Sequence, residues 1–246
     1  MDAPVAITPD TTIYEAMQIM QEHNCAYCGV VDTAQHLLGM VTKSDISVVG
    51  LDDTARSIDI LAHTSCENIR KTINGAIIYD DPQVTINGKV SIIAMTRPER
   101  LDHYEVEKRI VIVGADTMAQ KKCIQLGAGM LIVVWADTVA DEVIEEARVH
   151  HCPILLSGHG TMNTSRYLYF APSVERIMKK NPVCFHTNEL TEDVGVKMLR
   201  NRYRTYPVLD ANEQLVGYIS RYHIMDAPKR KLILVDHNEF SQSVNA

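Results

Sequence analysis

Cationic side chains gather in the last third of the chain, although the net charge of the whole sequence is −7. Between residues 172 and 231 there are eleven Lys or Arg against seven Asp or Glu. Guanidinium and imidazole groups bind phosphate oxygens well, and the cations of interest are Arg202, Arg204, Arg221 and His223. Tyr203 or Tyr206 could stack on a planar base. These residues indicate a small anionic ligand, while charge alone leaves a solvated basic face as the alternative.

A second candidate for chemistry stands near the C-terminus. The apolar run Leu232-Ile-Leu-Val235 predicts a buried strand, and Asp236-His237-Asn-Glu239 follows it directly. A hydrolytic two-metal centre needs several carboxylate and His ligands, and the sequence has no His-x-Asp-x-Asp pattern. We therefore expect no metal site and no catalytic residue in this chain alone.

The pair Cys25 and Cys28 has the spacing of a zinc or redox motif. A structural zinc site needs four ligands, and no second Cys-x-x-Cys occurs. We expect these thiols to pack at the entrance of a buried strand.

The cationic residues Arg202, Arg204, Arg221 and His223 lie within an internal repeat. A window of 43 residues, Pro4 to Ile46, recurs 178 residues later as Pro182 to Ile224. Its pattern predicts an extended segment, a helix from Thr12 to about Asn24, a hairpin of two short strands, and a second helix from Lys43. The predicted helix starts at Lys43 and Arg221 add backbone N–H donors for an anion.

The segment from 65 to 171 shows a different pattern of apolar residues. Apolar runs at 109–113, 130–135 and 153–156 alternate with predicted helices at 116–126, 138–149 and 164–170. Strands that alternate with helices of this length indicate βαβ units around a parallel sheet. Further strands are expected at 76–79 and 90–95, after a helix at 65–73.

The repeated hairpin with its Gly-apolar-apolar-Thr/Ser-x-x-Asp signature resembles the cystathionine-β-synthase (CBS) domain, which works in tandem pairs that bind adenosine nucleotides. The resemblance implies that Asp45 holds ribose hydroxyls, with Thr42 and its neighbour near the ribose or phosphate. Copy two departs from the pattern, because His223 replaces that Asp. The predicted ligand contacts are Thr8, Ala26, Tyr27, Thr42, Lys43, Asp45, Val183, Arg202, Arg204, Thr205, Tyr206, Pro207, Ser220, Arg221 and His223.

The middle segment resembles the DRTGG domain, a module found beside CBS pairs. The likeness rests on the string that ends in Gly114-Ala115-Asp116 and on the string from Pro153 to Thr161. The segment has no Gly-x-Gly-x-x-Gly fingerprint and no defensible nucleophile–base pair. The expected fold class is α+β and α/β, a tandem CBS pair of αββα repeats with an inserted DRTGG-type βαβ domain.

The strand before Asp236 and His237 resembles the metal-binding motif of family II inorganic pyrophosphatases, in the DHH superfamily. Some members carry a CBS–DRTGG–CBS insertion just before this motif. The resemblance implies CBS domain 1 at 1–62, a DRTGG-like domain at 65–171, CBS domain 2 at 172–227, and a linker with the first strand of a truncated catalytic domain at 228–246.

The same resemblance implies a regulatory, non-catalytic region. Its regulatory ligands would be AMP, ADP, ATP or diadenosine tetraphosphate, and its partners a second copy through the CBS domains and the catalytic domains of the same polypeptide. Manganese, cobalt or magnesium would bind only in the full-length enzyme, where Asp236 and His237 could be ligands.

Composition limits the alternatives. The acidic balance argues against nucleic acid as a partner, and no apolar stretch is long enough to span a membrane. The start of the chain lacks the features of a signal peptide, and six scattered cysteines suggest a reducing cytoplasm. A stand-alone CBS/DRTGG sensor, or a small enzyme with its activity in the middle domain, remains the alternative.

Overall fold

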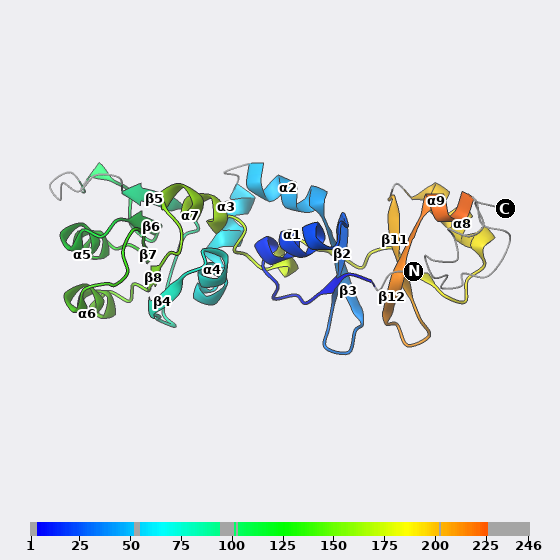
Figure 1. Ribbon diagram of the computed structural model, residues 1–246, viewed down its shortest axis with the longest axis horizontal. Coiled ribbons are helices and arrows are strands. Elements are labelled where there is room, and N and C mark those ends of the chain that lie inside the picture. Colours follow the sequence, from blue (N-terminus) through cyan, green and yellow to red (C-terminus); the bar gives the residue numbers. More distant parts are fainter. Residues whose placement is uncertain (1–3, 52–54, 94–100, 102, 202, 226–246) are drawn as a thin grey trace. The chain divides into compact units, whose positions relative to one another are not determined.

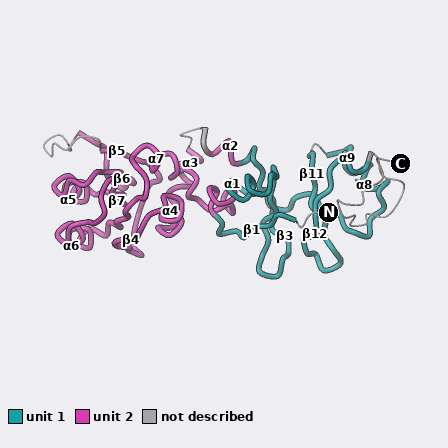
Figure 2. The backbone as a smooth tube through the Cα atoms, viewed as in Figure 1, with its two compact units in different colours: residues 1–11, 18–45, 177–246 teal, residues 12–17, 46–176 magenta. Residues whose placement is uncertain are grey.

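The computed structural model describes residues 4–51, 55–93, 101, 103–201 and 203–225. The chain divides into two compact units, one of residues 1–11, 18–45 and 177–246 and one of residues 12–17 and 46–176 (Figure 2). The division falls within two helices, α1 (Ile13–Glu22) and α2 (Lys43–Leu51). The predicted strand 232–235 and the predicted roles of Arg202, Asp236 and His237 lie outside the described residues.

The first unit contains the repeat as two matching hairpins (Figure 1). Strands β2 (Tyr27–Val31) and β3 (Leu37–Thr42) pair antiparallel, as do β11 (Thr205–Leu209) and β12 (Leu215–Ser220). A short strand runs parallel to each hairpin, β1 (Ala6–Ile7) beside β2 and β10 (Phe185–His186) beside β11. Both hairpins shift register at the same place, between the last two residues of their first strand. The repeated sequence therefore folds in the same way twice.

The hairpin turns show how the repeat encodes its structure locally. Asp32 Oδ1 accepts hydrogen bonds from the backbone N–H groups of residues 34 and 36, at 2.8 and 2.9 Å. Asp210 Oδ1 accepts from residues 212 and 214 at the same two distances. An Asp at this point satisfies turn N–H groups with its own carboxylate, so each copy fixes its turn with one residue.

Contacts between the copies show an approximate two-fold relation. His36 forms an isolated antiparallel bridge with Gln214, and Tyr27 is hydrogen bonded to the Thr205 side chain. Each pair joins positions 178 apart, so each residue meets its own equivalent. A residue that meets its own equivalent lies beside the axis that exchanges the two copies. An apolar cluster of Val31, Leu209 and Leu215 packs in the same unit.

The two copies differ at their edges. Among the described residues, copy one alone gains a fourth strand, since β9 (Lys179–Lys180) pairs antiparallel with β3. Copy two packs β10 to β12 against α8 (Thr191–Arg200), with α9 (Arg221–Met225) following β12. Its core contains Phe185, Tyr206 and Met198, all of them buried.

The second unit is a three-layer α/β domain built on one five-stranded sheet, in the order β4-β8-β7-β6-β5. Strands β5 (Val90–Ile93), β6 (Ile110–Val113), β7 (Met130–Val133) and β8 (Ile154–Leu156) are parallel. Strand β4 (Ala76–Tyr79) is antiparallel to β8, so the prediction of a parallel sheet was incomplete at this edge. An edge strand needs only one partner and can join in either direction.

Helices cover both faces of this sheet. Helices α5 (Thr117–Gln125) and α6 (Asp141–Val149) pack on the face that carries Val111 and Leu131. Helices α3 (Ala55–Ala62), α4 (Cys66–Thr72) and α7 (Thr161–Leu168) pack on the face that carries Ile110 and Ile132. Successive strand residues point to opposite faces, and both faces are buried, so β6 and β7 are apolar throughout.

Two helix starts differ from expectation, and α3 was not predicted. Helix α6 begins at Asp141, three residues after the predicted start at 138. Helix α7 begins at Thr161, three residues before the predicted start, because Gly160 takes the extended conformation of an N-cap there. Within the described ranges, no helix has the length and apolarity needed to cross a membrane.

Candidate functional site

The predicted ribose contact of copy one lies in a helix cap. Thr42 donates two hydrogen bonds to Asp45 Oδ2, from its backbone N at 2.9 Å and from its hydroxyl at 2.6 Å. Asp45 N donates in return to the Thr42 hydroxyl at 3.2 Å. The backbone N of Lys43 donates to the carbonyl of Ala26 at 3.0 Å, which ties the start of α2 to the start of β2. Within the described part of the chain, Asp45 Oδ1 accepts no hydrogen bond and is the free atom of this cap.

Copy two builds the equivalent cap with an imidazole. The backbone N of Ser220 donates to His223 Nδ1 at 3.1 Å, and the Ser220 hydroxyl lies 3.0 Å from the same nitrogen. The His223 side chain is exposed. His223 thus takes over the capping role of the carboxylate that the family pattern places here.

The two caps lie at the same end of the paired hairpins. In the strand registers, Tyr27 is opposite Thr42 and Thr205 is opposite Ser220. Since Tyr27 and Thr205 are themselves hydrogen bonded, these residues form one row across β3, β2, β11 and β12. The row ends at Asp45 on one side and at His223 on the other. Each of the predicted residues Asp45, Thr42, Tyr27, Thr205, Ser220 and His223 thus neighbours the next along this row.

Tyr218 was not predicted, and it is the aromatic residue that crosses from copy two into copy one. Its hydroxyl accepts from the Gly29 backbone N at 2.6 Å and donates to the Val5 carbonyl at 2.8 Å. Its ring meets Tyr27 edge-on, with 4.7 Å between ring centroids. Burial raises the pKa of Tyr218, so the hydroxyl keeps its proton. The sequence feature that could have identified Tyr218 is that it replaces Met40 at the equivalent strand position of the repeat.

The ring of Tyr27 is half-buried, and burial is also the main reason why its pKa is raised. Beside it, burial and the neighbouring Cys25 raise the pKa of Cys28 to about 12. All six cysteines are free thiols, and Cys28 is fully buried, as expected for packing.

Two predicted contacts are engaged within the fold, Tyr206 wholly and Arg221 in part. Tyr206 is fully buried between Phe185 and the rest of the copy-two core, and its hydroxyl donates to the Tyr203 carbonyl at 3.0 Å. It therefore cannot stack on a base, because its strand turns this side chain inward. Arg221 donates from Nη2 to the Met198 carbonyl at 2.9 Å and also to the Asn201 carbonyl. Nη2 of its guanidinium thereby closes the end of α8, and a contact with an anion stays a prediction.

The Tyr203 side chain is partly exposed, but Lys179 already contacts its ring and its hydroxyl. The Lys179 Nζ lies 4.0 Å from the ring centroid and is hydrogen bonded to the Tyr203 hydroxyl. The Thr8 hydroxyl donates to Asp10 Oδ1 at 2.5 Å. Of the remaining predicted residues, the side chains are exposed at Ala26, Lys43, Val183 and Arg204 and buried at Pro207.

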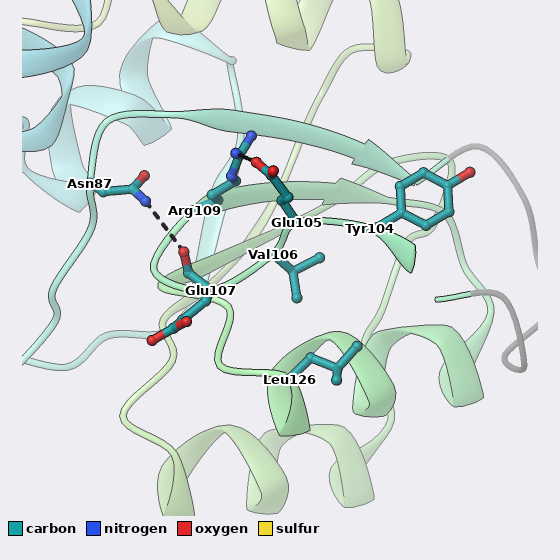
Figure 3. A pocket seen from close by; sticks show the side chains of 7 residues that line it. All are labelled: Asn87, Tyr104, Glu105, Val106, Glu107, Arg109 and Leu126. Atoms are coloured by element: carbon teal, nitrogen blue, oxygen red, sulfur yellow. Dashed lines mark hydrogen bonds and ion pairs between the residues drawn. The ribbon is translucent and has the colours of Figure 1, made fainter. Parts of the chain in front are cut away.

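An open cavity of about 360 Å³ lies elsewhere, at the strand starts of the second unit (Figure 3). The Arg109 guanidinium there is ion-paired with Glu105, and Asn87 Nδ2 donates to the Glu107 carbonyl at 3.3 Å. The cavity contains none of the predicted ligand residues, and none of its seven lining residues is a Cys, Ser or His. In the part of the chain that the structure describes, no three His, Cys, Asp or Glu side chains are grouped to hold a metal ion.

Comparison with known proteins identifies the two modules. The CBS domain family matches residues 1–51 and 174–230, and the DRTGG domain family matches residues 68–170. The crystal structure of the CBS and DRTGG domains of the regulatory region of Clostridium perfringens pyrophosphatase, complexed with the activator diadenosine tetraphosphate, is similar with a TM-score of 0.80. It is 32% identical in sequence, and the match covers 90% of this chain and 96% of that chain.

Two curated relatives are longer proteins. The cobalt-dependent inorganic pyrophosphatase of Clostridium perfringens is 34% identical over 247 residues, which are 100% of this chain and 45% of the relative. The probable manganese-dependent inorganic pyrophosphatase of Thermotoga maritima is 25% identical over 98% of this chain and 44% of its own length. The chain therefore spans less than half the length of the curated relatives it matches.

These matches confirm the predicted fold class, a tandem CBS pair with an inserted DRTGG domain, and the prediction of a regulatory rather than a catalytic region. The chain belongs to the family of CBS–DRTGG regulatory regions of inorganic pyrophosphatases.

Proposed function

We propose that this chain senses adenine nucleotides and controls a metal-dependent inorganic pyrophosphatase of which it is a part. The ligands are AMP, ADP, ATP or diadenosine tetraphosphate, bound by the CBS pair. The whole protein hydrolyses inorganic pyrophosphate with manganese, cobalt or magnesium, and Asp236 and His237 contribute to the metal site there. Six free cysteines suit a reducing compartment, and we place the protein in the cytoplasm.

The row of side chains from Asp45 to His223 is the observation that carries this proposal. It provides a free carboxylate oxygen for hydroxyl groups at Asp45, an aromatic ring at Tyr27 and an imidazole at His223, all at one end of the paired hairpins. Exposed Lys43 is the first residue of α2, and exposed Arg204 directly precedes β11. A ribose, a base and a phosphate need these three kinds of partner.

Regulation requires that a ligand binds one arrangement of the CBS pair better than another. Tyr218 is suited to this requirement, because one hydroxyl links copy two both to Val5, just before β1, and to Gly29 in β2 of copy one. A ligand that competes for Tyr27 or Gly29 would act on this link. Coupling free energies between sites are usually about 1–3 kcal/mol.

A symmetric homodimer through the CBS domains is part of the proposal. Helix α8 buries Val194 and Met198 in its own copy, yet Val196 is 50% and Leu199 80% exposed. Leu190, just before the helix, is 49% exposed. An exposed apolar row on a helix is typical of an interface, and a two-fold axis would place two such rows against each other.

Calorimetric titration of the chain with AMP, ADP, ATP, diadenosine tetraphosphate and S-adenosylmethionine tests the proposal. We expect binding of at least one phosphate-bearing adenosine compound at micromolar concentration, which corresponds to about 8 kcal/mol. Asp45→Ala should weaken it by about tenfold or more, since a charge-assisted hydrogen bond to the ribose is lost. Asp59→Ala, an exposed Asp on α3, serves as the matched control. The absence of heat with every adenosine compound would exclude the sensor function.

A further inference from the structure

Three neighbouring strands of the DRTGG domain end at the same level. In the registers of β6, β7 and β8, Val113 lies opposite Val133, and Val133 lies opposite Leu156. The segments that follow these strands therefore leave the sheet along one side, which we call the carboxyl edge and define as residues 114–118, 134–140 and 157–162. The chain runs from β7 to α6 on one face and from β8 to α7 on the other. In α/β sheets, connections that diverge in this way flank the usual place of binding.

Each segment of the carboxyl edge exposes one large apolar side chain. The exposed fractions are 64% for Met118, 77% for Trp135 and 72% for Met162. A single exposed apolar residue is ordinary, but three on adjacent segments of one edge are typical of an interaction surface. Trp and Met are also enriched in the contact surfaces of proteins, and a flexible thioether adapts to differently shaped partners.

The indole of Trp135 is held in one orientation although it is exposed. Trp135 has a φ of +60°, a left-handed conformation that bulky residues rarely adopt. A Cβ atom at Gly160 would lie 2.3 Å from Cζ2 of the indole, so the ring packs directly on this glycine. A side chain that is already oriented loses little conformational freedom when a partner binds. Trp135 is therefore suited to be the anchor of the surface.

The charge of the carboxyl edge selects among possible partners. Its three segments contain Asp116 and Asp137 and neither Lys nor Arg, and the first turn of α6 adds Asp141 and Glu142. Lys121 of α5 is already ion-paired with Glu142. Two copies of this edge would bring like charges together, and an anionic lipid surface would be repelled. A cationic group, in contrast, is attracted both by carboxylates and by the face of an indole.

We propose that the carboxyl edge of the DRTGG domain is a docking surface for a protein segment that presents Arg or Lys between apolar side chains. The apolar side chains of the partner pack on Met118, Trp135 and Met162, and its cation lies near Asp137. The inference goes beyond nucleotide sensing and does not depend on it, since the surface belongs to the inserted domain. It gives this domain a binding function of its own.

Trp135 is the single Trp of the chain, so its fluorescence reports directly on this surface. The probes are two synthetic amphipathic helical peptides without Trp, one of Leu and Arg and one in which Glu replaces every Arg. Each is titrated into the unmodified chain. We expect a saturable blue shift of the emission at micromolar concentration of the Leu/Arg peptide, because the exposed indole becomes covered. The Leu/Glu peptide should cause no shift.

Two variants test the charge and the orientation separately. Asp137→Lys should weaken binding of the Leu/Arg peptide at least about tenfold, whereas Asp59→Lys, the matched change on exposed α3 of the same unit, should stay within about twofold. Gly160→Ala should displace the indole and weaken binding about threefold or more. The φ of −72° at Gly160 suits Ala, and chemical denaturation checks that each variant keeps its fold.

Every other outcome contradicts the proposal in a defined way. Equal shifts with both peptides, or equal affinities of Asp137→Lys and Asp59→Lys, would show that a cation is not recognised. A blue shift on raising the concentration of the chain alone would assign the edge to a second copy. A blue shift with vesicles of anionic phospholipid would assign it to a membrane. Nucleotide titrations of the same chain are independent of these results, so the sensor function stands or fails separately.

Discussion

The same backbone cap is made by Glu15, Asp45 and His223, three side chains with different chemistry. Among the described residues, capping leaves Asp45 Oδ1 and the second ring nitrogen of His223 without a hydrogen-bond partner. Arg221 differs, since Nη2 of its guanidinium is already engaged by the carbonyls of Met198 in α8 and of Asn201 after it. At the scale of single residues, function therefore follows from the bonds that the fold has already used.

Asp81 gives a residue-scale prediction for stability against pH. It is 6% exposed and accepts from the Tyr79 hydroxyl at 2.5 Å, from Gln83 N at 2.7 Å and from the His151 ring at 3.0 Å. These bonds, that of Tyr79 foremost, lower the pKa of Asp81 from 3.8 to about 2. A carboxyl whose pKa is lower in the folded state than in the unfolded state stabilises the fold at any pH above its unfolded pKa. For Asp81 this contribution is lost as pH falls from about 4 to about 2.

Between pH 4 and 2, unfolding of the DRTGG domain should take up protons, because Asp81 is ionised in the folded state and protonated in the unfolded state. We expect Asp81→Asn to take up fewer protons on unfolding than the unmodified chain, by up to somewhat less than one, so its stability should depend less steeply on pH. Urea unfolding at several pH values, followed by Trp135 fluorescence, measures this difference. Asp59→Asn, an exposed carboxylate, should retain the original pH slope. Equal slopes for Asp81→Asn and the unmodified chain would show that the three bonds do not lower the pKa of Asp81.

At the scale of elements, the carboxyl end of α8 depends on a residue from another element. The last carbonyls of a helix have no partner within the helix. Arg221, the first residue of α9, donates to the carbonyls of Met198 and Asn201 and brings a positive charge to the negative end of the helix dipole. In this way α9 holds α8 in place by two bonds from one side chain.

Arg221→Met should lower the free energy of unfolding by about 1–2 kcal/mol, because two carbonyls lose a charged donor while the aliphatic stem is kept. Chemical denaturation measures the loss. Arg200→Met, an exposed residue at the end of the same helix, is the matched control and should stay within about 0.5 kcal/mol of the unmodified chain. A loss in Arg221→Met no larger than in this control would argue against the capping role.

At the scale of the whole molecule, the CBS pair is a duplication whose halves have become unequal. Copy one receives Tyr218 and β9, whereas copy two holds Tyr206 and Phe185 in its core. The α/β domain inserted between them has the connectivity of an independent unit, with its own core on both faces of one sheet. The proposed homodimer adds a further level, in which α8 supplies the contact surface.

Leu199→Glu should raise the dimer dissociation constant by at least about tenfold, since a two-fold axis brings the new charge in twice and both copies lose an apolar contact. Sedimentation velocity over a range of concentrations measures the shift. Val149→Glu, on an equally exposed site of α6, is the control and should leave the dimer intact. A monomeric unmodified chain, or an unaffected dimer in Leu199→Glu, would remove α8 from the interface.

The sequence by itself determined the repetition and most of the elements, although not α3 or β9. Apolar periodicity, Asp turns and Ser or Thr caps act within a few residues, so the hairpins, the helix starts at Lys43 and Arg221 and the βαβ rhythm were readable from spacing. The exchange of Asp45 for His223 was visible for the same reason. These features need no knowledge of distant contacts.

Only the tertiary structure decided which of the candidate side chains remain available. Tyr206 faces the core, Arg221 caps a helix 20 residues away in sequence, and Tyr218 bonds to Val5 across 213 positions. Burial and long-range hydrogen bonds depend on which elements pack together, and residue type alone does not specify that packing. The type of each residue was known from the start, but its free donor or acceptor emerged only when the fold had satisfied the others.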